Sequence, residues 1–343
     1  MRTIYSDRHH RHHGNAELID GTLKPCFEMP RRAEMILARV REVGLGEVVA
    51  PGAFGLEPVT RVHDAGFVEF LGSAWTEWTA LGRTNDALPL VWPVPGVRHD
   101  RVPLHIDGRL GYYSFDAGVP ITAGTWDAVQ AAADVALTGA QALVDGAAGA
   151  FALCRPPGHH AGTATMGGYC YLNNAAIAAQ YLRDHGCARV AILDVDYHHG
   201  NGTQQIFDAR ADVLFVSLHA DPQVAYPYFL GYADERGSGP GEGATRNYPL
   251  PLGTTWAGYG AALDDACAGI DAWGPDAIVV SLGVDTYVHD PISHFRLTRD
   301  DFPRLGARLA RLERPTLFVM EGGYAVDDLG INAVAVLTGF LAG

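Results

Sequence analysis

The sequence has few cysteines and no paired cysteine motif. Its 343 residues include five cysteines, an odd number, and none of them belongs to a C-x-x-C pair. Scattered cysteines argue against a disulfide framework and against a zinc site built from thiolates, and they suit a reducing compartment. A cytoplasmic location is therefore expected. The cysteines are Cys26, Cys154, Cys170, Cys187 and Cys267.

Long apolar runs are also missing. Nothing in the chain approaches the roughly 18 consecutive apolar residues of a membrane span. Residues 1–13 are polar and contain no apolar core of the kind that signal peptides have. We therefore expect neither export nor a membrane partner.

Basic residues are scarce relative to acidic ones. The chain has 25 Lys and Arg against 39 Asp and Glu, so its formal net charge is −14. This charge disfavours non-specific binding of nucleic acid and would attract cations. Because acidic surfaces also keep ordinary cytosolic proteins soluble, the charge supports a cationic substrate only weakly. It does not separate a small polyamine from a basic protein tail.

Internal repeats and low-complexity tracts are absent, and the composition changes at only one place. Within residues 81–120, several prolines interrupt any regular element. Roughly forty residues without a clear element is long for a connection and indicates a functional or partner-contacting loop. The helical segment after this loop leads directly into the part that carries the motifs, so we do not interpret the loop as a linker. The prediction is a single domain over residues 1–343 with a Pro-rich insertion loop at 81–120.

Strand and helix patterns alternate through the second half of the chain. This alternation predicts an α/β fold, an open parallel sheet with helices on both faces. The predicted strands are 150–154, 190–193, 213–218, 277–282 and 316–320. The predicted helices are 30–43, 127–144, 174–184, 258–272 and 300–312.

Two histidine-containing stretches near the start receive ordinary interpretations. Residues 3–5 predict a short strand, and the polar loop after it contains His9, His10, His12 and His13. Such a cluster can bind a transition metal loosely, but its neighbours offer no supporting groups, so a solvated loop is expected. His63 and Asp64 are interpreted as the start of a helix in preference to a catalytic dyad.

The most informative stretch is 190–203, VAILDVDYHHGNGT. Its first half is an apolar, β-branched run typical of a buried strand. Since side chains alternate along a strand, Asp194, Asp196 and His198 would project to one side. Carboxylates and an imidazole are costly to bury there unless a cation or proton transfer uses them. The pattern predicts a metal site.

Polar side chains follow each of the five predicted strands. In open parallel sheets, ligands bind in the crevice outside the carboxyl ends of the strands, so these groups should converge on one place. The segments are 155–160 (RPPGHH), 194–201 (DVDYHHGN), 219–221 (HAD), 283–285 (GVD) and 321–324 (EGGY).

For the metal, Asp196 and His198 lie two residues apart on one face, and Asp285 is the best third ligand from another strand. Two carboxylates, one imidazole and an open position match catalytic zinc. Oxygen-rich sites also accept Fe(II), Co(II) or Mn(II), so the pattern predicts the site without fixing the metal. In the alternative interpretation, the two aspartates cap helices and His198 fills a pocket.

The other strand ends supply acid–base and oxyanion groups. The pair His159-His160 suits proton transfer near neutral pH, and Asp194 and Asn201 are available to orient these rings. Tyr324, after two glycines, could donate its hydroxyl to a developing oxyanion. The segment 167–169 (GGY) would let the backbone approach a slim substrate beside an aromatic wall, although a tyrosine in such a turn often serves only packing.

Taken together, these residues resemble the histone deacetylase superfamily, which shares the arginase-like α/β fold. The matching blocks occur in family order at 155–160 (RPPGHH), 167–176 (GGYCYLNNAA), 192–204 (ILDVDYHHGNGTQ), 217–219 (SLH), 281–286 (SLGVDT) and 321–324 (EGGY). Within the superfamily the chain looks most like the bacterial acetylpolyamine amidohydrolases. That resemblance includes 219–232 (HADPQVAYPYFLGY) and 284–295 (VDTYVHDPISHF).

The resemblance implies a role for each matched residue. Asp196, His198 and Asp285 would bind zinc, and His160, supported by Asn201, would be the main base and acid. His159, paired with Asp194, would give electrostatic support, and Tyr324 would share the carbonyl oxygen with zinc. The channel residues would be Gly168, Tyr169 and Tyr226. A potassium ion beside the zinc would use Asp194, Asp196, His198, Ser217 and Leu218.

The resemblance also implies a homodimer in which the 81–120 loop narrows the partner's active-site tunnel, with acidic groups at the rim that receive the distal ammonium. Glu17 matches that pattern, and Asp107 stands where a longer glutamate is expected. Gly118 falls where another glutamate is expected, with Asp116 close by. These departures leave the preferred polyamine length open.

The predicted function is a zinc-dependent amidohydrolase that deacetylates acetylputrescine, acetylcadaverine or acetylspermidine. One alternative is a deacetylase of acetyl-lysine in proteins or of another small acylated amine. A second is an arginase-like two-manganese hydrolase, although Tyr197 and Asn201 occupy places where that chemistry needs aspartates. The third is a non-catalytic protein that only binds acylated amines.

Overall fold

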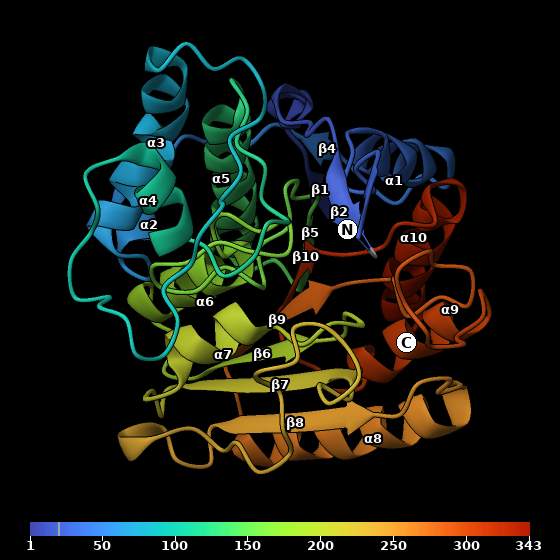
Figure 1. The fold of residues 1–343 in the computed structure, drawn as a ribbon. Helices are drawn as coiled ribbons and strands as arrows, with labels where there is room; N and C mark the ends of the chain where they lie inside the picture. Colours follow the sequence, from blue (N-terminus) through green and yellow to red (C-terminus); the bar gives the residue numbers. More distant parts are fainter. Residues whose placement is uncertain (20) are drawn as a thin grey trace.

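The structure, a computed structural model, describes residues 1–19 and 21–343. One sheet of eight parallel strands runs through the molecule, and a separate two-stranded antiparallel hairpin lies near its edge (Figure 1). In spatial order the sheet contains β4 (Val48–Val49), β1 (Arg2–Ile4), β5 (Gly149–Ala152), β10 (Thr316–Met320), β9 (Ala277–Leu282), β6 (Val190–Asp194), β7 (Val213–Ala220) and β8 (Thr245–Leu250). The hairpin is β2 (Glu17–Ile19) and β3 (Thr22–Lys24).

The helices cover both faces of the sheet, as predicted, because β strands with two buried faces need apolar cover on each side. Successive residues of β10 show this: Leu317 and Val319 join one apolar cluster, and Phe318 and Met320 join the other. The first cluster includes side chains of α3 (Ala65–Ala80), α5 (Thr125–Val144) and α6 (Asn174–Asp184). The second includes α1 (Arg31–Glu42), α8 (Trp256–Trp273), α9 (Asp301–Ala310) and α10 (Val326–Ala342).

Several shorter elements complete the chain. They are η1 (Asp7–Arg11), α2 (Glu57–Thr60), α4 (Ile106–Tyr112), α7 (Asn201–Phe207) and η2 (Gly239–Gly241). In the described part of the chain, no helix is both long and apolar enough to cross a membrane.

The five strands and five helices predicted from the sequence are all present, and no boundary differs by more than two residues. Asp64 caps the N-terminus of α3, since its Oδ1 accepts hydrogen bonds from the N–H groups of Gly66 and Phe67. The prediction of a helix start at His63 and Asp64 is therefore confirmed. The strands are short apolar runs and the helices have apolar residues at helical spacing, and side-chain caps at Asp64 and Asn173 also mark the starts of α3 and α6.

Three sequence predictions need correction. The 81–120 loop was expected to lack regular structure, but α4 lies within it. The edge strand β8 was not predicted because its sequence, TRNYPL, mixes polar residues and proline. The expected solvated histidine loop is wrong for His9 and His12, which are both 3% exposed. His12 packs against Tyr171, and its Nδ1 lies 3.0 Å from Thr125 Oγ1, so distant segments bury it.

Candidate active site

The candidate site lies at the carboxyl ends of the central strands. In the sheet, β6 sits between β9 and β7, and β10 sits between β9 and β5. Because all these strands are parallel, the segments that follow β5, β6, β9 and β10 leave the sheet at the same edge. Four of the five segments expected to converge therefore do so. The fifth does not reach the cavity: His219, on β7, is bonded to Ser217 and to the Gly231 carbonyl, and neither His219 nor Asp221 lines the cavity described below.

Asp196, His198 and Asp285 lie together, buried, with one ligand atom from each within 4.8 Å of the others. His198 Nδ1 is 3.2 Å from Asp196 Oδ1 and 3.0 Å from Asp285 Oδ2. The second oxygen of each carboxylate is held by a main-chain N–H: Gly322 donates to Asp196 Oδ2 at 2.8 Å, and Tyr197 donates to Asp285 Oδ1 at 2.8 Å. Each carboxylate is thus oriented, with its other oxygen turned toward the imidazole.

Two glycines make room for this group. A Cβ at Gly283 would lie 2.1 Å from Asp196 Oδ2, and one at Gly322 would lie 2.5 Å from the same oxygen and 2.6 Å from Asp285 Oδ2. Side chains at either position would displace the carboxylates. Two oriented carboxylates and one imidazole are a donor set that fits Zn²⁺ and other divalent transition metals.

Asp194 and His159 form a second buried pair beside this group. Asp194 Oδ2 is 2.9 Å from His159 Nδ1, and Asp194 Oδ1 accepts a hydrogen bond from the Asp196 N–H at 3.1 Å. Burial opposes protonation of His159, but the charges of Asp194 and Asp196 outweigh it and raise the pKa of His159 to about 10. His159 is therefore a cation at neutral pH.

His160 has the opposite electrostatic character. Its Nδ1 lies 2.7 Å from the side-chain oxygen of Asn201, the first residue of α7, so Nδ1 carries the proton and Nε2 has a free lone pair. Burial, and then the neighbouring His159 and His198, hold the pKa of His160 well below its usual value. The pair thus contains one charged and one neutral imidazole.

Tyr324 lies on the other side of the site, after Gly322 and Gly323. Burial raises the pKa of its hydroxyl well above the usual value, so the group is a proton donor for hydrogen bonds. Its ring meets the Tyr169 ring edge-on at 5.5 Å between centroids, and the Arg32 guanidinium lies 4.7 Å from its centre.

These groups line a cavity of about 580 Å³. His160, His198 and Tyr324 contribute to its wall, together with Gly168 and Tyr226. Gly168 is required at its position, because with φ +50 it passes so close to His160 that a Cβ would lie 2.5 Å from the imidazole. The remaining lining residues are Glu17, Leu18, Ile19, Asp116, Ala117, Gly118, Tyr169, Tyr197, Val224, Ala225, Tyr228, Pro291, Ile292 and His294.

The predicted rim carboxylates lie in three different environments. Glu17 lines the cavity and accepts a hydrogen bond from the Phe27 N–H at 2.6 Å. Asp116 also lines it, but its oxygens accept from the N–H groups of Gly118 and Gly168 and from the Tyr226 hydroxyl. Asp107 is not among the lining residues; it lies on α4, where its carboxylate forms a two-pronged ion pair with Arg83.

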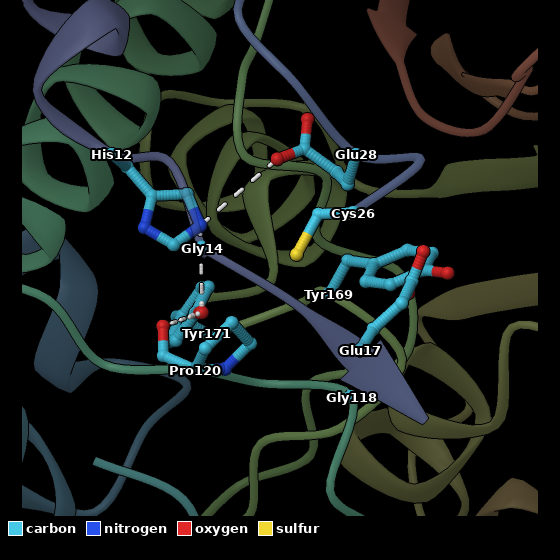
Figure 2. A pocket seen from close by; sticks show the side chains of 9 residues that line it. All are labelled: His12, Gly14, Glu17, Cys26, Glu28, Gly118, Pro120, Tyr169 and Tyr171. Atoms are coloured by element: carbon cyan, nitrogen blue, oxygen red, sulfur yellow. Dashed lines mark hydrogen bonds and ion pairs between the residues drawn. The ribbon is translucent and has the colours of Figure 1, made fainter. Parts of the chain in front are cut away.

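A second, very small cavity shares the lining residues Glu17, Gly118 and Tyr169 with the large one (Figure 2). Its volume of about 10 Å³ corresponds to about one water-sized sphere. His12, Cys26 and Glu28 border it, and Glu28 is held by two buried arginines, Arg32 at 3.0 Å and Arg155 at 2.9 Å. Arg32 also donates to the Gly323 carbonyl at 2.7 Å, so this cluster of charges contacts the segment that carries Tyr324.

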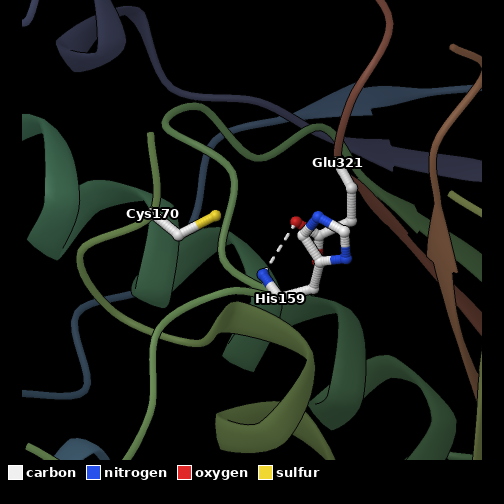
Figure 3. A group of neighbouring side chains, drawn as sticks. All are labelled: His159, Cys170 and Glu321. Carbon is white, nitrogen blue, oxygen red and sulfur yellow. Dashed lines mark hydrogen bonds between the residues drawn. The ribbon is translucent and has the colours of Figure 1, made fainter. Parts of the chain in front are cut away.

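The sequence analysis included Glu321 among the strand-end groups but assigned it no role; the residue is fully buried beside His159 and Cys170 (Figure 3). Glu321 Oε2 accepts hydrogen bonds from the main-chain N–H groups of Gly158 at 2.6 Å and His159 at 3.2 Å. It therefore fixes the segment that carries the two histidines. Its signal in the sequence was a carboxylate directly after an apolar strand, the same signal that pointed to Asp194.

Ser217 and Leu218, predicted at a potassium site, lie on β7, next to β6, and both are buried. Ser217 pairs with Asp194 in the register of the two strands, and its hydroxyl lies 2.8 Å from His219 Nδ1. The two residues are therefore neighbours of Asp194.

Comparisons with known proteins agree with the resemblance inferred from the sequence. The histone deacetylase domain matches residues 26–340. Two Pseudomonas aeruginosa proteins, acetylpolyamine amidohydrolases 2 and 1, are 61% and 60% identical over 340 and 341 residues; each alignment covers 99% of this chain, and 98% and 99% of the relatives. The crystal structure of an acetylpolyamine aminohydrolase from Burkholderia pseudomallei has a TM-score of 0.95 at 41% identity, covering 100% of this chain and 99% of that one.

These matches span the fold and the site together, and they confirm the predicted resemblance and the predicted arginase and deacetylase type of fold. They also confirm that the chain is a hydrolase acting on amides. With its parallel sheet, two-histidine segment and Gly-Gly-Tyr loop, the chain belongs to the histone deacetylase domain family.

Proposed function

We propose that the protein is a zinc-dependent amidohydrolase that converts acetylated polyamines to the free amine and acetate. Acetylputrescine, acetylcadaverine and acetylspermidine are the proposed substrates. The observation that carries the proposal is one cavity lined by a neutral His160, by Tyr324 and by His198, which belongs to the buried metal-ligand group. The names of relatives about 60% identical to this chain support the polyamine substrate.

Asp196, His198 and Asp285 would hold one Zn²⁺ per chain, with Fe²⁺ or Co²⁺ as substitutes. When bound, such a metal polarises a carbonyl group and acidifies water. We further propose K⁺ beside Asp194, Ser217 and Leu218, with Asp196 and His198 close to it. The burial of several carboxylates in this region supports a second cation.

Three side chains act on the substrate: His160 transfers protons, and Tyr324 and His159 stabilise the negative charge that develops. His160 Nε2 accepts the proton of the attacking water, because Asn201 keeps the proton of the neutral ring on Nδ1. His160 then returns the proton to the amine as the C–N bond breaks. Tyr324 donates its hydroxyl to the carbonyl oxygen as negative charge develops there. The His159 cation adds to the stabilisation of that charge, and the Asp194 carboxylate orients its ring.

Gly168, Tyr169 and Tyr226 would bind the acyl end of the substrate. Glu17 is the rim carboxylate best placed to attract a distal ammonium, since it accepts one main-chain hydrogen bond, whereas Asp116 accepts from two main-chain N–H groups and the Tyr226 hydroxyl. Asp107 would contribute only through a second subunit. We propose a homodimer formed through the 81–120 loop of a single-domain subunit, and apolar side chains exposed on that loop, such as Leu90 (79%) and Leu104 (98%), support it.

The test is a competition assay with a mixture of acetylated diamines, acetylspermidine and an acetyl-lysine peptide, given to the zinc-loaded protein. We expect kcat/KM for release of free amine to be at least about tenfold higher with the acetylated polyamines than with the peptide. A tenfold preference for the peptide would overturn the substrate assignment. Metal analysis should give one zinc per chain, and two manganese ions would instead favour arginase-type chemistry.

A further inference from the structure

The segment that carries Tyr324 is held by contacts from other parts of the chain: Arg32 Nε donates to the Gly323 carbonyl at 2.7 Å, and the Val284 N–H donates to the Gly322 carbonyl at 3.1 Å. Two glycines, Gly322 and Gly323, precede the tyrosine, and Gly323 has φ +126, which L side chains rarely adopt. The next helix, α10, begins at Val326 and has no side-chain cap. A tyrosine that must point its hydroxyl at one substrate atom therefore needs support from outside its own segment.

Asp290 supplies a contact of this kind. It is 7% exposed, and its Oδ2 accepts a hydrogen bond from the Tyr324 main-chain N–H at 2.7 Å. Its Oδ1 accepts from the Ile292 N–H at 3.1 Å. The carboxylate thus binds the Tyr324 main chain and the cavity wall at the same time, since Pro291 and Ile292 both line the cavity.

The loop that carries Asp290 is anchored independently of Tyr324. A bridge between Tyr287 and Leu297 closes its base, and the Asp290 N–H donates to the Tyr287 carbonyl at 3.0 Å. Phe295, 1% exposed, packs edge-on against Tyr197 in the core. The position of Asp290 is therefore set by contacts within its own loop. The hydrogen bond between the two residues thus fixes the Tyr324 main chain, and Asp290 does not depend on it.

We propose that Asp290 is a positioning residue for Tyr324: it fixes the main chain of the Gly-Gly-Tyr segment so that the hydroxyl stays aimed at the carbonyl oxygen of the substrate. This inference rests on the proposed function of Tyr324. A carboxylate is needed because two N–H donors approach two different oxygens. An asparagine can accept only one of them and turns its own NH₂ toward the other.

The experiment is a double-mutant cycle with Asp290→Asn and Tyr324→Phe in the zinc-loaded enzyme, assayed with acetylcadaverine. Tyr324→Phe should lower kcat on the order of 10²–10³-fold. Asp290→Asn should lower kcat by roughly 10- to 100-fold with KM changed by less than about twofold, because it moves a group that acts mainly in the transition state. In the double variant, Asp290→Asn should add less than about threefold to the loss.

Asp301→Asn is the matched control. Asp301 is also a buried aspartate whose oxygen accepts a main-chain N–H, that of Thr298 at 2.9 Å, but it lies at the start of α9, away from the cavity. The control should lower the unfolding temperature without a specific loss of kcat. If the loss of kcat in the double variant equals the product of the losses in the two single variants, the residues act independently and the proposal is overturned. A folded Asp290→Asn variant with wild-type kcat would also overturn it.

Hydrogen exchange of the Tyr324 amide gives a readout that does not depend on activity. Asp290→Asn should speed exchange in a peptide covering 321–325 by about tenfold or more, since the protecting acceptor is lost, and Asp301→Asn should leave it unchanged. Unchanged exchange in Asp290→Asn would overturn the proposal, and Asp290→Glu provides a second variant if asparagine prevents folding. Wild-type enzyme that releases no amine would overturn the proposed function, while the exchange comparison still decides whether Asp290 holds Tyr324.

Discussion

At the scale of single residues, the hydrogen-bond partner of each histidine in the His159-His160 pair determines whether its ring is charged or neutral. His159 and His160 are adjacent in the sequence and their ring centroids are 4.0 Å apart. The carboxylate of Asp194 makes one ring a cation, whereas the amide oxygen of Asn201 leaves the other neutral. An amide orients the ring without adding the negative charge that would favour its protonation.

The first prediction concerns Asn201. In the variant Asn201→Ala, the His160 ring loses the acceptor that keeps its proton on Nδ1. We expect kcat/KM to fall by roughly 10- to 100-fold, as is usual when the orienting partner of a functional histidine is removed. The zinc content should remain at the wild-type value, because Asn201 is not in the ligand group. A zinc-loaded variant within twofold of wild-type activity would contradict the assigned role.

The second prediction concerns Gly283, the glycine beside the proposed metal ligands. In Gly283→Ala, the new Cβ would lie 2.1 Å from Asp196 Oδ2 and would push that carboxylate out of place. We expect zinc affinity, measured by competition with a chelator, to fall by about tenfold or more. The control Gly258→Ala lies in α8, where the nearest atom to the new Cβ is 3.6 Å away, and should bind zinc normally. Equal zinc affinity of the two variants would show that Asp196 is not a ligand.

At the scale of elements, the loops after the strands are tied to one another by buried side chains. His63, just before α3, illustrates this. Its Nδ1 donates to the Gly162 carbonyl at 2.9 Å, and its Nε2 accepts from the Asn173 N–H at 2.9 Å. It thereby joins the end of the two-histidine segment to the start of α6. The bond from Asn173 requires the neutral ring, because protonation would turn Nε2 into a donor.

The third prediction follows from the charge state of His63. Burial lowers its pKa from 6.5 to about 4. Between these values the unfolded chain binds a proton that the folded chain does not, so stability is present above pH 6.5 and is lost as the pH falls toward 4. When the pH falls from 6.5 to 4, the free energy of unfolding should decrease in both proteins. The decrease should be smaller in His63→Asn than in wild type, by roughly 3 kcal/mol. Denaturant unfolding of both proteins at several pH values measures the difference.

The exposed residue His99 provides the control for that experiment. The same substitution there, His99→Asn, should leave the pH dependence of unfolding unchanged, since an exposed side chain meets similar surroundings before and after unfolding. If His63→Asn and wild type lose stability in parallel as the pH falls, His63 is not the group that links protonation to unfolding.

At the scale of the whole molecule, the 81–120 loop presents apolar side chains to solvent. Leu104 is 98% exposed and Leu90 is 79% exposed, and Val91, Val94 and Val97 are each more than half exposed. Exposed apolar side chains gathered in one loop of an otherwise strongly acidic protein favour an interaction surface there. The proposed homodimer would cover it and would bring the loop of one subunit to the cavity of the other.

The fourth prediction tests that assembly. Leu104→Glu places a charge where the proposed interface is apolar, and losing the burial of one leucine costs about 1.5–3 kcal/mol per subunit. Sedimentation should show a dimer for wild type and a shift toward monomer for the variant, together with a rise in KM. The control Leu341→Glu alters a leucine near the end of α10 that is 52% exposed, and should remain dimeric. A wild-type monomer at micromolar concentration would contradict the proposed dimer.

The sequence alone predicted the central strands, the main helices and the groups that converge at the strand ends. It did so because these features are local: apolar runs define strands, capping residues define helix starts, and a buried D-x-D-x-H pattern is costly unless a cation uses it. Edge strand β8 and the short α4 lacked such signals, and only packing against the rest of the chain forms them.

The tertiary structure decided which donors face each carboxylate. From the sequence, Asp107 and Asp116 were predicted to bind substrate, whereas Glu321 and Asp290 had no assigned role. In the structure, Asp107 pairs with Arg83 and Asp116 binds its neighbours, while Glu321 and Asp290 hold the histidine and tyrosine segments. The role of a carboxylate depends on the donors that face it, and here those donors come largely from segments distant in the chain.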